Sequence, residues 1–63
     1  MIGDIIERVV RYEWLLEQEE EFMREAYKDK DWNSVNKSAA MIRELEEKVS
    51  VAVKRIDELA RLN

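Results

Sequence analysis

The side chains of this sequence that could take part in chemistry are carboxylates. Glu17, Glu20 and Glu21 share part of one helical face, and oxygen ligands of this kind can hold a hard cation. The spacing Glu-x-x-Glu occurs at Glu17–Glu20 and again at Glu44–Glu47. Neither His nor Cys occurs in the 63 residues, so the commonest metal ligands and the commonest general base are missing.

In a chain this rich in Glu such spacings arise by chance, and a solvated charged face explains them. We therefore expect no catalytic residue, no metal site, no cofactor and no enzyme activity. The elements that carry these residues are helical by composition, because Pro is absent, Gly occurs once and 41% of the residues are charged.

The charge of the chain is uneven. Residues 4–25 hold eight acids against three bases, a net −5, whereas residues 32–63 hold six bases against five acids, a net +1. A chain with a total of −4 and no cluster of bases is repelled by nucleic acids and anionic membranes, so we expect neither as a partner. No apolar run approaches about 18 residues and no signal-like start is present, which favours the cytoplasm.

Two segments carry the spacing of an amphipathic helix. The first is expected over residues 4–29, with Asp4 as N-cap and Glu7 completing a capping box. The second is expected over residues 32–62, with Asp31 as N-cap and Asn33 or Ser34 as alternatives. The apolar stripe of the first is Ile2, Ile5, Val9, Tyr12, Leu16, Met23 and Ala26, with Glu19 in the remaining position, and that of the second is Val35, Ser38, Ile42, Leu45, Val49, Ala52, Ile56 and Leu59.

The join between the segments predicts a turn. Lys28-Asp-Lys-Asp-Trp-Asn-Ser34 is rich in Asp, Asn and Ser, and one continuous helix would place Lys30, Asn33 and Lys37 in the apolar stripe. We therefore predict an all-α fold, an antiparallel hairpin. Folding back near residues 30–31 pairs residues whose numbers sum to about 61, which sets Leu16 against Leu45 and lets large residues meet small ones.

A hairpin covers its seam from two sides only, and six apolar residues flank that seam. Each exposed Leu or Phe forgoes about 1.5–3 kcal/mol, so we expect two hairpins to dimerise into a four-helix bundle. The oligomer interface predicted in this way consists of Ile6, Leu15, Phe22, Met41, Val53 and Leu62.

Four residues have two or more interpretations. Val10 and Trp14 continue from Ile6 as a separate ridge, which could dock a partner, pack inside the oligomer or be without consequence. Glu19 could fix the register as a buried polar residue, although we favour a side chain that reaches the edge of the seam near Arg43. Trp32 is expected to close the end of the bundle, with a partner contact as the alternative.

The stretch from Leu15 to Leu59, around Lys28-Asp-Lys-Asp-Trp-Asn and Ile42-Arg-Glu-Leu-Glu-Glu-Lys48, resembles the helical hairpin of flagellar export chaperones of the FlgN/FliT type. The resemblance is one of composition, covers only the hairpin and transfers no individual functional residue. It implies a protein that holds an amphipathic segment of an export substrate in a helical groove. In layout, the chain also resembles the small plasmid copy-control hairpins that bind RNA as four-helix bundles, but those use a basic and polar face.

The sequence thus predicts a non-enzymatic protein-interaction module, a small helical adaptor, chaperone or assembly factor that self-associates through helix packing. Its expected partners are itself, as a homodimer or higher oligomer, and another helical protein segment. The alternative is a small dimeric nucleic-acid-binding regulator with a four-helix-bundle layout.

Overall fold

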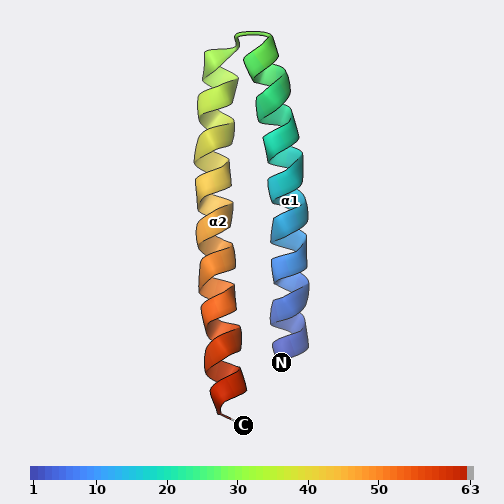
Figure 1. Ribbon diagram of the computed structural model, residues 1–63, viewed down its shortest axis with the longest axis vertical. Coiled ribbons are helices and arrows are strands. Elements are labelled where there is room, and N and C mark those ends of the chain that lie inside the picture. Colours follow the sequence, from blue (N-terminus) through green and yellow to red (C-terminus); the bar gives the residue numbers. More distant parts are fainter. Residues whose placement is uncertain (63) are drawn as a thin grey trace.

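A computed structural model describes residues 1–62 and shows two antiparallel helices joined by a short turn (Figure 1). Helix α1 spans Ile2–Lys28 and helix α2 spans Trp32–Arg61. The predicted all-α hairpin is confirmed, and the turn rules out one continuous helix. Neither helix in the described part of the chain is long and apolar enough to cross a membrane.

The start of α1 differs from the prediction. The helix begins at Ile2 rather than near residue 4, Met1 is its N-cap, and no side chain caps it. The Asp4 cap is therefore wrong, because Asp4 lies inside the first turn, where an acid still interacts favourably with the helix dipole. The two added residues include Ile2, the first position of the predicted apolar stripe, which is half-buried. The other boundaries agree with the predicted ones to within one residue.

The turn is built from two helix caps. Asp31 is the N-cap of α2, as predicted, and its carboxylate accepts a hydrogen bond from the Ser34 backbone N–H at 3.3 Å. At the end of α1, the Lys30 N–H donates to the Tyr27 carbonyl and the Asp31 N–H donates to the Ala26 carbonyl, the hydrogen-bond pattern of a Schellman motif. Lys30 adopts a left-handed backbone with φ of 57°.

The buried and half-buried residues lie along the predicted seam. All sixteen stripe positions, eight in each helix, are buried or half-buried, and outside them only Ser34 and Ala39 are not exposed within residues 1–62. Within residues 1–62 only Ala26, Ser38 and Leu45 are buried, and all three lie in the halves of their helices nearest the turn. The seam is therefore correct in position but covered on two sides only.

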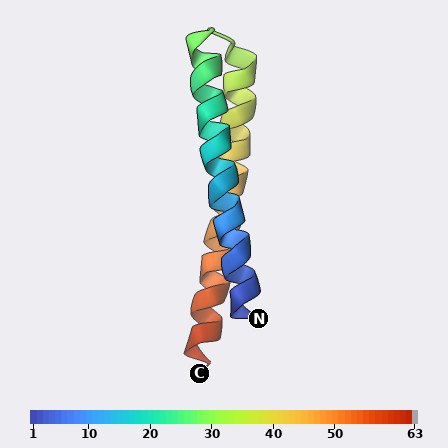
Figure 2. The same ribbon diagram turned by 90° about the vertical axis from the view of Figure 1, so that its right-hand side faces the viewer.

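The shape explains the thin cover. The hairpin extends about 50 Å along its axis and only 14 by 10 Å across it. Figure 2, which turns the hairpin by 90°, shows one helix lying over the other, so the molecule is a single layer of two helices. Two broad faces of this layer have no second layer packed on them, and the residues that flank the seam lie on these faces.

Candidate interaction surfaces

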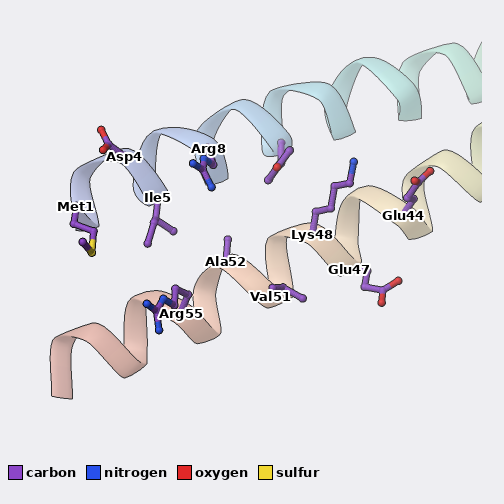
Figure 3. Close-up of a pocket in the computed structure, with 11 residues that line it drawn as sticks. Met1, Asp4, Ile5, Arg8, Glu44, Glu47, Lys48, Val51, Ala52 and Arg55 are labelled. Atoms are coloured by element: carbon purple, nitrogen blue, oxygen red, sulfur yellow. The ribbon is translucent and has the colours of Figure 1, made fainter. Parts of the chain in front are cut away.

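One broad face carries a groove of about 700 Å³ between the helices in the half that holds the termini. Arg8 of α1 and Lys48 and Arg55 of α2 line this groove. Figure 3 shows Lys48 extending toward α1 and Ile5 pointing toward α2, whereas Asp4 and Glu47 point away from the facing helix. The groove is therefore lined by both cations and acids, and of its acids Asp4 and Glu47 lie on its outer side.

The groove identifies which flanks of the two helices share a face. Residues seven apart lie on the same side of a helix, so Leu15 and Phe22 follow Arg8, and Met41 precedes Lys48 on the same side. We call this surface the basic face. Its members, in chain order, are Met1, Arg8, Leu15, Phe22, Ser34, Met41, Lys48, Arg55 and Leu62.

The other broad face flanks the opposite side of the seam. It carries Glu13, Glu20 and Glu46, and it has no base. We call this surface the acidic face. Its members, in chain order, are Ile6, Glu13, Glu20, Tyr27, Ala39, Glu46, Val53 and Ala60.

The structure leaves all six predicted interface residues exposed, but it does not bring them together on one surface. Leu15, Phe22, Met41 and Leu62 belong to the basic face, and Phe22 is 56% exposed. Ile6 and Val53 belong to the acidic face. A second copy that packs on one broad face would therefore cover only part of the predicted set.

The predicted ridge forms a separate surface on the outside of α1. Val10 and Trp14 are 62% and 57% exposed, and together with Ile6, Glu7 and Arg11 they line a shallow depression of about 470 Å³. Because Trp14 lies eight residues after Ile6, two turns further along the helix, the ridge runs away from the acidic face toward the outer side.

Trp32 and Glu19 are the two remaining residues with alternative interpretations. Trp32 packs edge-on against Tyr27, with ring centroids 5.5 Å apart, and it stays more than half exposed at the turn. Glu19 is half-buried in the seam, and no ion pair joins it to Arg43 in residues 1–62. Trp32 therefore lies at the edge of the packed region, whereas Glu19 is as buried as most other positions of the seam.

The carboxylates that could act as cation ligands stay apart from one another. Glu17, Glu20 and Glu21 are all exposed, and no three acidic side chains in the described residues are grouped as a metal ion would require. The separation of charge between the two broad faces was not predicted from the sequence. The signal was present in the spacing of seven between Lys48 and Arg55 and between Glu13 and Glu20.

Comparison with family models, with curated proteins and with solved structures finds no match to this chain. The resemblance to flagellar export chaperones therefore stays a prediction. The fold and the surfaces define the chain, within residues 1–62, as a two-helix antiparallel hairpin with two uncovered broad faces.

Proposed function

We propose that this protein is a non-enzymatic interaction module, an adaptor, chaperone or assembly factor that self-associates by packing its helices against further helices. One observation carries the proposal. Within residues 1–62, twelve large hydrophobic side chains are exposed while Ala26 and Leu45 are the only buried hydrophobic residues.

The balance of burial supports association. A single hydrophobic core in a chain below about 70 residues rarely supplies more than 3–5 kcal/mol, and here even the seam is mostly half-buried. Burying a side chain such as Phe22 against a second molecule adds about 1.5–3 kcal/mol. A second copy is always present at the protein's own concentration, and another amphipathic helical segment offers the same chemistry.

The test is the mass of the folded species. Sedimentation equilibrium, combined with circular dichroism across a range of concentrations, should show helical particles of at least twice the 7.6 kDa chain mass. Dilution should lower the mass and the helix content together, because the apolar faces lose their cover. A well-folded monomer at micromolar concentration would overturn the proposal.

Nucleic-acid binding is the weaker proposal. Arg8, Lys48 and Arg55 line one groove, but Asp4, Glu44 and Glu47 line it too, so its formal charge is zero. A phosphate-binding surface needs an excess of bases. Retention on RNA that falls steeply with added salt would support this alternative instead.

A further inference from the structure

We propose that the acidic face of one copy binds the basic face of a second copy that is turned end for end. This inference rests on the proposed self-association and specifies its geometry. It follows from the charges on the two broad faces, from the placement of their apolar residues along the hairpin, and from a match between them residue by residue.

The charges are complementary between the faces and repulsive within each. At the positions that directly flank the seam, the basic face carries Arg8, Lys48 and Arg55, a formal +3, while Asp4, Glu44 and Glu47 also line the groove on this side. The acidic face carries three glutamates and no base, a formal −3. A twofold dimer that buries the same face of both copies would bring like charges together, whereas joining unlike faces brings opposite charges together.

The apolar residues fix the relative direction of the two copies. On the basic face, Leu15, Phe22 and Met41 lie toward the turn and the cations lie toward the termini. On the acidic face, Ile6 and Val53 lie toward the termini, the glutamates lie in the middle and nearer the turn, and Tyr27 and Ala39 lie closest to the turn. With one copy turned end for end, every apolar residue in the pairs below meets an apolar residue and every acid meets a base.

In that arrangement α1 of one copy lies parallel to α2 of the other. One register of this helix pair matches the flanking residues of all four heptads. Residues of α1 on the acidic face meet residues of α2 on the basic face that are numbered 35 higher. Two of the pairs are apolar and two join opposite charges. The pairs are Ile6 with Met41, Glu13 with Lys48, Glu20 with Arg55, and Tyr27 with Leu62.

The second helix pair matches as well. Residues of α2 on the acidic face meet residues of α1 on the basic face that are numbered 38 lower. These pairs are Ala39 with Met1, Glu46 with Arg8, Val53 with Leu15, and Ala60 with Phe22. The two registers differ by three residues, about 4.5 Å along a helix, a stagger that long side chains span.

The side chains needed for these contacts are available. Glu13, Glu20, Glu46, Arg8 and Lys48 are exposed, and none of them forms an ion pair within residues 1–62. Arg55 pairs with Glu58 at 3.4 Å, but both side chains are more than half exposed. Such surface pairs contribute little to stability, so Arg55 can exchange this partner for Glu20 of a second copy.

This mode of association does not close on itself. Each copy that uses its acidic face still presents its basic face, and an end-for-end turn combined with a shift adds copies in a line. The particle mass should therefore rise with concentration beyond two chains. High salt should weaken the assembly, because screening reduces attraction between exposed charges.

Charge reversal tests the pairing of faces. The triple variant Arg8→Glu, Lys48→Glu, Arg55→Glu should raise the dissociation constant roughly ten- to a hundredfold, and Glu13→Lys, Glu20→Lys, Glu46→Lys should do the same. The chain that carries all six changes should associate like the original. The matched control changes the net charge by the same amount as the reversal of the basic face, but at exposed positions outside both faces. It carries Arg11→Glu, Arg24→Glu and Lys54→Glu and should retain most of the association.

Cysteine pairs test the register, because the chain has no Cys of its own. Mixing the single variants Glu13→Cys and Lys48→Cys under mild oxidation should give mostly the mixed disulfide between them. Glu20→Cys mixed with Lys48→Cys is the control, since its sites lie a heptad out of register, about 10 Å, beyond the reach of a disulfide.

The outcomes separate this inference from the proposed function. If the chain associates but single-face reversal has no more effect than the control, or if each cysteine variant pairs chiefly with itself, the face-to-face inference is wrong and the self-association stands. If the chain is a folded monomer, the proposed function itself fails.

Discussion

The Ser34 hydroxyl donates a 2.7 Å hydrogen bond to the carboxylate of Asp31, whose other oxygen accepts from the Ser34 backbone N–H. These two bonds, the side-chain bond first, lower the pKa of Asp31 below its usual value near 3.8, and Lys37 contributes in the same direction. The carboxylate thus joins the start of α2 to the turn and prefers to be charged in the folded state.

This relationship predicts a pH-dependent stability. A carboxyl group whose pKa is lowered by folding stabilises the protein above its unfolded pKa, and the stabilisation is lost as the pH falls through the folded value. Asp31→Ala should therefore lower the unfolding midpoint in urea at neutral pH, and its difference from the original chain should shrink well below pH 3.8. Asp29→Ala, in the same turn without such bonds, is the control. A difference that persists unchanged in acid would contradict this prediction.

The second prediction is that replacing Lys30 stabilises the protein. Its φ of 57° is a left-handed conformation that costs an L residue about 1–2 kcal/mol, and Gly adopts it freely. Lys30→Gly should raise the free energy of unfolding by up to about 1 kcal/mol, once the greater chain entropy of Gly is counted. Thermal unfolding at fixed protein concentration measures the gain. The control is Lys54→Gly within α2, which should instead lower the free energy of unfolding by about 1 kcal/mol. If both variants were less stable than the original chain, the turn would not need this backbone conformation.

Ser38 gives a third prediction. Its side chain is 1% exposed, and its hydroxyl has no hydrogen-bond partner within the described residues. An unpaired buried hydroxyl costs about 1–3 kcal/mol, and Ala is the better helix former. Ser38→Ala should therefore stabilise the hairpin by about 1 kcal/mol or more, which raises the melting temperature of so small a domain by about 4–8 °C.

The control for Ser38 is Ser50→Ala. Ser50 lies on the exposed side of α2, so this change gains only the difference in helix propensity, about 0.5 kcal/mol. A gain at Ser38 no larger than the gain at Ser50 would mean that the buried hydroxyl finds a partner in solution, such as a backbone carbonyl one turn earlier.

The seam and the second N-cap could be predicted from the sequence because both depend on local spacing. Apolar residues three and four apart fix one side of a helix, and Asp31 three residues before Ser34 is a local capping signal. The prediction of Asp4 as the N-cap of α1 was wrong because it used local spacing alone. Asp4 has the local pattern of a cap, but Ile2 gains burial when the helix begins earlier. The left-handed Lys30 carried no signal, because neither Gly nor Asn stands there.

The candidate surfaces were harder to predict because they depend on both helices. Phe22 and Ile6 each flank the seam, and spacing within α1 alone does not say which flank of α2 joins each of them. The antiparallel direction decides this, and the groove shared by Arg8 and Arg55 reveals it. Once these flanks are matched, the separation of acids from bases follows directly from the sequence.

Trp14 tests where the ridge lies in the assembled protein. It occupies the outer side of α1, away from both broad faces, and is 57% exposed. In a Trp32→Phe variant, Trp14 is the sole tryptophan, and acrylamide should quench its fluorescence equally well in dilute and concentrated samples. Val10 and Trp14 would then remain open in the assembly and available to a different helical partner. Protection of Trp14 at high concentration would instead place the ridge inside the self-associated interface, and the matched Trp14→Phe variant would show whether Trp32 becomes protected with it.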